Sequence, residues 1–225
     1  MNKLKILAII PARGGSKSIP LKNIKIINNK PLINYSIESA LKSKIFDHII
    51  VSTDHKKIKK ISSKHKKIII FNRTKKISSD DASTEVVVED VLKKIQDLKN
   101  YTPDWVFILE PTSPLRSIET IRKAKKIIKK KKNFNSLISI KKIDHDPARL
   151  KKDKINFIFK RVNNRQKRNS LYCETSTLYC VKNSYFLKRK KIVEEKPLGF
   201  LIPKIESIDI NDIEDFKIAE KILNN

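Results

Sequence analysis

The stretch IIPARGGSKSIPLKN, residues 9–23, directly follows an apolar run and decides the fold prediction. Gly14 and Gly15, two of only three glycines in the chain, stand side by side in it, among Arg13, Lys17 and Lys22. Glycine tolerates a positive φ and lets a bulky anion approach the backbone closely. A strand that ends in such a turn, with three cations around it, predicts a cradle for a triphosphate.

This turn matches neither of the two common phosphate-binding glycine motifs. It lacks the GxxxxGK[ST] pattern of P-loops and the GxGxxG pattern of dinucleotide-binding folds. The hydroxyl groups of Ser16 and Ser18 add donors to the surrounding charge and favour an anion-binding loop. An ordinary Gly-Gly turn with solvated lysines is the plainer alternative.

Short, almost continuous apolar runs alternate with helical stripes along the rest of the chain. Such runs are typical of buried parallel strands, and apolar residues three or four apart are typical of helices packed on a sheet. The expected strands are 4–10, 48–53, 67–71, 104–109, 135–140 and 177–181. The expected helical stripes are Ile33, Ile37 and Leu41; Val88, Val91, Leu92 and Ile95; Ile118, Ile121, Ala124 and Ile128; and Phe216, Ala219, Ile222 and Leu223. This alternation predicts a three-layer α/β/α, Rossmann-like sandwich with a mostly parallel sheet.

Residues 144–175 interrupt this rhythm. Ile155, Phe157 and Phe159 alternate with polar residues, and several turn formers flank them. The segment therefore predicts a β-hairpin that leaves the sheet as an arm. We expect one domain over residues 1–225 with this arm inserted in it.

Composition limits the compartment and the partners. The chain has 225 residues, 39% of them hydrophobic, and no apolar run approaches the ~20 residues of a membrane span. Arg13 cuts short the apolar start, so no signal peptide is expected. Cys173 and Cys180 lack the company of metal-site motifs and predict free thiols in a reducing compartment, which indicates the cytoplasm.

The formal net charge of +27 suggests a polyanion partner. However, only nine of the 51 basic residues are arginine, and the lysines are spread along the chain at solvent positions. Drift toward lysine on solvated faces is therefore the favoured interpretation, and a real polyanion-binding surface is the alternative. No specific nucleic acid and no membrane partner is expected.

Five further segments extend the pattern of residues 9–23 in order and spacing. They are HIIVSTD (48–54), SSDDAST (78–84), LEPTSPLR (109–116), RQ (165–166) and SIDINDIEDFKIAEKIL (207–223). With the opening stretch they resemble the acylneuraminate cytidylyltransferases, which make CMP-activated nine-carbon sugar acids. The resemblance covers nearly the whole chain. It implies a nucleotide-diphospho-sugar transferase fold, with CTP and a nine-carbon keto-sugar acid as substrates.

The resemblance also implies nucleotide-binding roles for particular residues. The triphosphate side would comprise Arg13, Gly14, Gly15, Ser16, Lys17 and Lys22. Asn23, Arg73, Ala82 and Thr84 would contact the ribose or the cytosine. Charge-assisted hydrogen bonds from the cations would hold the phosphates.

A second set of residues is implied for the sugar and for a metal. The sugar side would comprise Glu110, Thr112, Ser113, Arg116, Arg149, Arg165 and Gln166. Arg149 and Arg165 would grip the sugar carboxylate, because a guanidinium binds a carboxylate bidentately. Asp209 and Asn211 would hold Mg²⁺ or Mn²⁺. Arg13, Lys22 and Asp209 are the expected catalytic residues, and His145 is a weaker candidate for a sugar contact.

Three departures from the family pattern bear on the substrate and the metal. Glu110 stands where the family often has Gln, and Asn211 stands where the metal segment often reads DID. Glu174-Thr175-Ser176 replaces a familiar NGA. A pseudaminic, legionaminic or Kdo-like acid is the alternative substrate, and a non-catalytic nucleotide-sugar or polyanion-binding protein is the alternative outside the enzymes. The resemblance also implies a homodimer formed through the arm.

Overall fold

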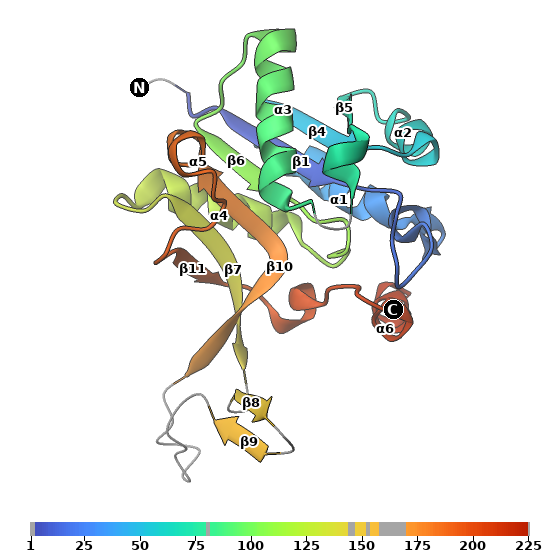
Figure 1. Cartoon of the computed structure of the whole chain (residues 1–225), viewed down its shortest axis with the longest axis vertical. Coiled ribbons are helices and arrows are strands. Elements are labelled where there is room, and N and C mark those ends of the chain that lie inside the picture. Colours follow the sequence, from blue (N-terminus) through green and yellow to red (C-terminus); the bar gives the residue numbers. More distant parts are fainter. Residues whose placement is uncertain (1–2, 80–81, 144–146, 152–153, 158–169, 225) are drawn as a thin grey trace.

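The computed structural model describes residues 3–79, 82–143, 147–151, 154–157 and 170–224. A seven-stranded sheet forms the middle layer, and helices cover both of its faces (Figure 1). The strand order is β11-β7-β10-β6-β1-β4-β5. The bounds are β1 (Ile6–Pro11), β4 (His48–Thr53), β5 (Ile68–Asn72), β6 (Trp105–Ile108), β7 (Ser136–Ile143), β10 (Leu171–Lys182) and β11 (Leu198–Leu201).

The sheet is mostly parallel, which confirms the prediction. Strand β1 pairs in parallel with β4 and β6, β4 pairs in parallel with β5, and β11 with β7. Strand β10 is antiparallel to both of its neighbours, β6 and β7. The run expected at 177–181 is the last part of this 12-residue strand, and β11 was not predicted.

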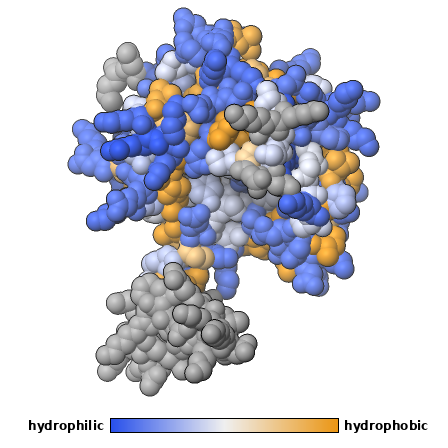
Figure 2. Space-filling model, viewed as in Figure 1, coloured by the Kyte–Doolittle hydropathy of each residue, from blue (hydrophilic) through white to orange (hydrophobic). Residues whose placement is uncertain are grey.

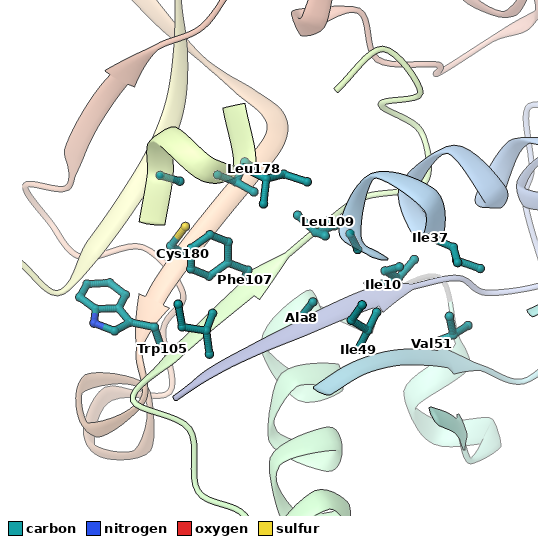
Figure 3. Packing of buried hydrophobic residues seen from close by; sticks show 14 of the residues in the cluster. Ala8, Ile10, Ile37, Ile49, Val51, Trp105, Phe107, Leu109, Leu178 and Cys180 are labelled. Atoms are coloured by element: carbon teal, nitrogen blue, oxygen red, sulfur yellow. The ribbon is translucent and has the colours of Figure 1, made fainter. Parts of the chain in front are cut away.

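Apolar side chains of the strands alternate between the two helical layers. One face packs on Ile33 and Ile37 of helix α1 (Leu32–Ser43) and on Ile121 and Ala124 of helix α4 (Ile118–Lys130). Figure 3 shows this face, where β1, β6 and β10 contribute side chains to one cluster. The other face packs on α3 (Thr84–Lys99) and α5 (Asn183–Arg189). Both faces of the sheet are buried, which explains why the strands read as continuous apolar runs.

Several helices end without glycine. The C-terminal caps of α1, α3 and α5 are Lys44, Asn100 and Lys190, which adopt left-handed φ values of 56°, 47° and 54°. Glycine usually takes this position because it has no Cβ. A chain with three glycines therefore accepts some backbone strain at its helix ends.

A third, smaller cluster fixes the edge where the site lies. Phe216 and Ala219 of α6 (Ile213–Leu223) pack with Ile19 of the loop after β1 and with Ile210. The small β2–β3 pair (Ile26–Ile27 and Lys30–Pro31) contributes Ile27. This packing holds the loop after β1 against the segment that precedes α6. The remaining helices in the described part of the chain are η1 (Lys22–Ile24), α2 (Lys56–Ser62), η2 (Lys75–Ser78) and η4 (Lys204–Ser207).

The predicted arm lies at the end of a long strand pair. Strands β7 and β10 stay paired out to Ile143 and Leu171, and β8 (Ala148–Lys151) pairs antiparallel with β9 (Lys154–Phe157). Figure 1 shows β8 and β9 away from the seven-stranded sheet. Phe159 and His145 lie outside the described residues. The division of the chain into one domain with an arm over 144–175 stays a prediction.

The surface in view is largely hydrophilic, with scattered apolar side chains (Figure 2). In the described part of the chain, no helix is long and apolar enough to cross a membrane. Both cysteines, Cys173 and Cys180, are free thiols, and Cys180 is buried in the core.

Candidate active site

The loop after β1 is held in place by the segment before α6. The Lys22 Nζ donates to the Ile210 carbonyl at 2.7 Å, and the Ser18 hydroxyl donates to the Asn211 carbonyl. Within the loop, Asn23 Nδ2 donates to the Arg13 carbonyl at 2.9 Å. Two segments almost two hundred residues apart therefore form one wall at the carboxyl edge of the parallel strands, where ligands of open α/β sheets bind.

Close packing explains one member of the glycine pair. Neither Gly14 nor Gly15 has a positive φ, so freedom of φ is not what requires glycine at these two positions. A Cβ on Gly14 would lie 2.7 Å from Cδ2 of His55, whereas a Cβ on Gly15 would meet nothing within 4 Å. The Gly14 N–H donates to Asp54 Oδ1 at 2.8 Å, so that donor is occupied within the chain. Gly14 is required by close packing against His55.

A cleft of about 210 Å³ opens beside this loop. Seven residues expected on the nucleotide side line it: Arg13, Ser16, Lys22, Asn23, Arg73, Ala82 and Thr84. Gly14, Gly15 and Lys17 are not among its lining residues. Burial lowers the pKa of Lys22, and the nearby charge of Asp209 opposes that shift. The structure therefore brings most of the predicted nucleotide residues together around one small cationic cleft.

Arg73 enters this cleft from the end of β5 and keeps a donor free. Its Nε donates to the Ser52 carbonyl at 3.1 Å and to the Ser52 hydroxyl at 3.0 Å. Its Nη2 is buried and has no hydrogen-bond partner in the described part of the chain. Burial lowers the pKa of this guanidinium, and Glu110 and Asp54 act against that. A buried donor without a partner is costly, so it suits a ligand acceptor.

A second cavity, of about 410 Å³, adjoins the cleft. The two share Thr84, Glu110 and Thr112. The other lining residues are Glu85, Glu174, Ser176, Tyr179, Ile192, Val193 and Asp209. With Glu110 included, the described lining of this cavity has four carboxylates and neither lysine nor arginine. The pair of cavities thus has a cationic compartment and an acidic compartment.

Part of the second cavity was missed by sequence reasoning. The strand β10 contributes Glu174 and Tyr179 across a register irregularity in its pairing with β7. The Tyr179 hydroxyl donates to Glu174 Oε1 at 3.0 Å, and burial raises the pKa of Tyr179. The unusual Glu174-Thr175-Ser176 triplet was a signal for this wall, although it gave no role to its residues.

Glu110 lies where the two compartments meet. Burial and then the charge of Asp209 raise the pKa of Glu110 to about 7, against the opposing charges of Arg116, Arg73 and Lys22. A carboxylate with this pKa exists in both protonation states near neutral pH. Its position at the end of β6 gives it access to both compartments.

Arg116 and Ser113 are placed differently from the other sugar-side residues. Arg116 is only 4% exposed, and it is not among the lining residues of either cavity. Its Nε donates to the Thr177 carbonyl at 2.7 Å, and Nη1 donates to the Ser36 hydroxyl at 3.1 Å. Its Nη2 donates to the carbonyl of Glu110 at 2.5 Å, and burial lowers the pKa of Arg116 to about 10. The structure places this guanidinium beneath the site, where it holds the backbone of Glu110. The Ser113 hydroxyl is also buried, without a partner among the described residues.

The remaining sugar-side predictions fall on the arm. Arg149 belongs to β8, and its side chain lies outside the described part of the structure. Arg165 and Gln166 lie outside the described residues altogether. Their predicted contact with a sugar carboxylate stays a prediction.

The two predicted metal ligands differ in their surroundings. Asp209 Oδ1 is buried and has no hydrogen-bond partner in the described part of the chain. Asn211 is exposed, and its Nδ2 donates to the Asp209 carbonyl at 3.3 Å. The described residues hold no group of three or more His, Cys, Asp or Glu side chains suited to a metal. An orphaned carboxylate oxygen beside a second acid fits a hard divalent cation that also takes ligands from a substrate.

Comparison with known proteins points in one direction. The cytidylyltransferase family model matches residues 7–220. The chain is 33% identical to the CMP-N,N'-diacetyllegionaminic acid synthase of Legionella pneumophila, over 98% of this chain and 97% of that protein. It is 32% identical to a pseudaminic acid cytidylyltransferase of Campylobacter jejuni, over 96% of this chain and 95% of that protein.

A solved structure shares the fold. A CMP-2-keto-3-deoxy-manno-octonic acid synthetase, solved with CTP, superposes with a TM-score of 0.74 over 98% of both chains. The sequence identity of that pair is 14%. The similarity is therefore one of fold.

Proposed function

The chain belongs to the cytidylyltransferase family, and from that premise we propose that it activates a nonulosonic, sialic-type sugar acid. It transfers CMP from CTP to the anomeric oxygen of the acid and releases pyrophosphate. The observation that carries this proposal is the pair of joined cavities, one cationic and one rich in carboxylates, with Glu110 and Thr112 at their junction. A donor and an acceptor held in adjoining compartments are what a group transfer requires.

The cationic cleft is the proposed nucleotide site. Arg13, Lys22 and Ser16 supply donors and charge for the triphosphate. The free Nη2 of Arg73 supplies a donor for an acceptor on the nucleotide. Asn23, Ala82 and Thr84 complete the wall around the ribose and base.

The larger cavity is the proposed sugar site. Its carboxylates and the hydroxyl groups of Thr112 and Ser176 accept hydrogen bonds from the many hydroxyl groups of a nine-carbon sugar. The described wall offers the sugar carboxylate no cation, so we assign that contact to Arg149 and Arg165, with Gln166 beside them. Relatives that act on diacetyllegionaminic and pseudaminic acids support a nine-carbon acid of that kind, without selecting among them.

The reaction exchanges one oxygen–phosphorus bond for another and releases the proton of the attacking hydroxyl to water. The anomeric hydroxyl oxygen of the sugar acid attacks the α-phosphorus of CTP, the bond from that phosphorus to the β-bridging oxygen breaks, and pyrophosphate leaves. Arg13 and Lys22 neutralise charge that builds up on the phosphates, and they need no covalent step of their own. Mg²⁺ or Mn²⁺, when bound at Asp209, supplies further charge neutralisation. Asp209, Arg13 and Lys22 are therefore the proposed catalytic residues.

We further propose a cytoplasmic homodimer in which the arm of one protomer reaches the active site of the other. The free thiols Cys173 and Cys180 and the long β7–β10 extension support these two points. Light scattering at micromolar concentration is expected to give twice the chain mass, and a monomer would contradict the dimer.

The decisive experiment measures pyrophosphate release from CTP and Mg²⁺ against a panel of keto-sugar acids. We expect release with at least one of sialic, legionaminic and pseudaminic acid, and a slower reaction or none with the eight-carbon acid Kdo. Replacement of CTP by ATP or GTP serves as the nucleotide control. Failure of every acid to release pyrophosphate would favour a nucleotide-sugar binding protein over an enzyme.

A further inference from the structure

Strand β10 changes its pairing where it forms one wall of the sugar cavity. Its register with β7 runs from Leu171 to Glu174 and resumes at Tyr179. Between these points, residues 175–178 of β10 lie opposite the single residue Ser139 of β7. In the described structure, pairing of β10 with β6 also covers only Tyr179 and the residues after it. This irregular segment, residues 175–178, is therefore not held by a regular ladder of strand hydrogen bonds.

The irregular segment divides its side chains between the cavity and the interior. Ser176 lines the sugar cavity, together with the flanking Glu174 and Tyr179. Thr175 and Thr177 are buried, with 6% and 1% of their surface exposed. Buried backbone groups without a strand partner need other hydrogen bonds, because an unpaired buried polar group is costly. Two buried side chains from neighbouring elements provide such bonds.

Ser139 of β7 is the first of these side chains. The Leu178 N–H donates to Ser139 Oγ at 2.9 Å, and the Thr175 hydroxyl donates to the same oxygen at 2.7 Å. The Ser139 hydroxyl lies 3.1 Å from the carbonyl oxygens of both Thr175 and Leu178, so it donates to one of them. Ser139 is fully buried. One hydroxyl group therefore takes the place of the missing ladder bonds at both ends of the irregular segment.

Arg116, in the loop after β6, is the second. Its Nε donates to the Thr177 carbonyl at 2.7 Å, and its Nη2 donates to the Glu110 carbonyl. Its Nη1 donates to the Ser36 hydroxyl at 3.1 Å, and that hydroxyl donates to the Glu110 carbonyl at 3.0 Å. The planar guanidinium thus ties β10, α1 and the loop after β6 together in a fixed geometry. Glu110 and Ser176, on two walls of the sugar cavity, are held relative to each other by this contact.

The Thr177 hydroxyl extends the network to the segment that bears Asp209. It donates to the Glu206 carbonyl at 2.9 Å, and the Glu206 carboxylate accepts from the Ser117 N–H at 3.1 Å. Glu206 is buried in η4, which directly precedes the segment with Asp209. The network therefore joins three segments that line the sugar cavity: β10, the loop after β6 and the segment before α6.

We propose that Arg116 and Ser139 are positioning residues for the sugar acid: they hold the irregular segment in the shape of its cavity wall without touching the acid. The proposal deepens the proposed function and rests on it. It also gives a role to Thr175, the middle residue of the Glu174-Thr175-Ser176 triplet, because its hydroxyl bonds Ser139. The placement of this wall matters because a displacement of about 1 Å greatly slows a positioned reaction.

Steady-state kinetics of the whole chain test the proposal, with CTP and the sugar acid varied in turn. Arg116→Lys is expected to raise the KM for the sugar acid at least about tenfold, because an ammonium keeps the charge but loses the planar fork that reaches three partners. Ser139→Ala and the near-isosteric Thr175→Val are expected to raise it at least about threefold. The KM for CTP is expected to stay within about twofold of wild type. The reason is that the loop after β1 has no hydrogen bond with Arg116 or Ser139 in the described structure.

Two variants control for the loss of similar contacts elsewhere. Arg122 of α4 donates to the carbonyls of Lys42 and Ser43 at 3.3 Å, and it is not among the described lining residues of either active-site cavity. Ser43 is a buried serine whose hydroxyl donates to the Ala40 carbonyl at 2.6 Å. Arg122→Lys and Ser43→Ala are expected to keep both KM values within about twofold of wild type.

Amide hydrogen exchange gives a readout that needs neither substrate nor activity. Ser139→Ala removes the acceptor of the Leu178 N–H, so exchange at Leu178 is expected to accelerate at least about tenfold. Ile9 lies in β1, which is paired on both sides, and its exchange is expected to stay as in wild type. This contrast separates a local change in β10 from a loss of global stability.

The proposal is overturned if Arg116→Lys, Ser139→Ala and Thr175→Val leave the KM for the sugar acid within about twofold of wild type, or if the two control variants raise it equally. An equal acceleration of exchange at Leu178 and Ile9 would overturn it as well, because a global loss of stability would then explain the kinetics. Wild-type protein that releases no pyrophosphate from CTP would contradict the proposed function itself.

Discussion

Carboxylates at the two ends of the central sheet behave in opposite ways. Where the parallel strands begin, Asp47 and Glu194 are surrounded by donors and their pKa values are lowered. Where the strands end, the pKa of Glu110 is raised, and Asp209 keeps a buried oxygen without a partner in the described structure. Carboxylates therefore stabilise the fold at one end of the sheet and are available to bind a ligand at the other.

The contacts at the starting end explain the lowered pKa values. Asp47 accepts from the Ile6 N–H at 2.8 Å and from Lys3 Nζ at 2.8 Å. Glu194 accepts from the N–H groups of Asn135 and Ser136 at 2.6 Å and 2.8 Å. Burial alone would raise both pKa values, and these donors overcome it. The carboxylates thereby satisfy backbone groups at the strand starts, which is a stabilising role.

This difference shows which end of the sheet lowers the stability of the chain. Repulsion between Glu110 and Asp209 and an unpaired donor on Arg73 lower the stability of the ligand-free chain. Such unfavourable groups persist where function needs them, and the rest of the fold compensates. Each prediction below tests whether the end where the strands begin contributes mainly to stability and the end where they finish contributes mainly to activity.

The largest expected effect concerns Asp209. We expect Asp209→Ala to lower metal-dependent kcat/KM for CTP by roughly 100-fold or more, about 2.7 kcal/mol of transition-state stabilisation. Asn211→Ala is expected to lower it far less, because it removes no full charge. Glu194→Gln, at the other end of the sheet, is the control. At temperatures below its melting temperature, its kcat/KM is expected to equal that of wild type. Equal losses for Asp209→Ala and Asn211→Ala, or activity that survives a chelator, would contradict the assignment.

The second effect is on the pH dependence of stability, measured by urea unfolding in EDTA. The folded pKa of Glu110 is above its unfolded value, so wild type loses stability as the pH rises from about 4.5 through 7. The raised pKa of Glu110 corresponds to a loss of at most about 3 kcal/mol in the free energy of unfolding, and solvent in the cavity reduces this loss to about 1–2 kcal/mol. The free energy of unfolding of Glu110→Gln is therefore expected to rise relative to that of wild type over that range and to equal it at pH 4.

Glu194→Gln should show the reverse. The folded pKa of Glu194 is below its unfolded value, so its stabilisation is present above about pH 4.5 and disappears as the pH falls through the folded pKa. The variant is expected to be less stable than wild type by about 1–2 kcal/mol at pH 7. Parallel pH profiles for the two variants would remove the contrast between the ends of the sheet.

The third effect concerns Arg13 at the mouth of the nucleotide cleft. Arg13→Ala is expected to lower kcat/KM for CTP at least about tenfold, or about 1.4 kcal/mol, since a phosphate loses its charged partner. Steady-state kinetics with saturating sugar acid measures it, and unfolding in urea should show little change. Turnover close to wild type would exclude the loop after β1 from phosphate binding.

Much of this architecture is predictable from the sequence because its signals are local. Buried strands such as β1 and β6 are continuous apolar runs, and stripes such as Val88, Val91 and Ile95 predict α3 directly. The nucleotide cleft is also predictable in outline, since loops at the carboxyl ends of parallel strands converge on one edge.

The remaining features depend on contacts between distant segments. The need for Gly14 comes from His55, which is close only after β1 and β4 have paired. Glu174 and Tyr179 reach the sugar cavity through an irregular pairing of β7 and β10. Arg116 has the residue type of a sugar ligand, but its partners on α1 and β10 hold it inside the protein. No local pattern encodes these placements.

The smallest expected effect tests whether bulk charge matters to the site. The lysines of KKIIKKKK (125–132) lie in the second half of α4 and just after it, and the apolar face of Ile121, Ala124 and Ile128 is buried. The helix begins after the Glu110 loop, and the last four lysines, 129–132, lie 11 or more residues from its start, or about 16 Å. Exposed charges at that distance are screened, because the Debye length is about 8 Å in physiological salt. We therefore expect replacement of four of these lysines by glutamine to change the KM for the sugar acid less than about twofold.

Arg165→Ala is the counterpart of the lysine variant and is expected to raise the KM for the sugar acid at least about tenfold, because a bound carboxylate loses its guanidinium. A lysine variant that raised the KM as much as Arg165→Ala would show that the +27 charge acts on the substrate, and it would place carboxylate recognition on the α4 surface.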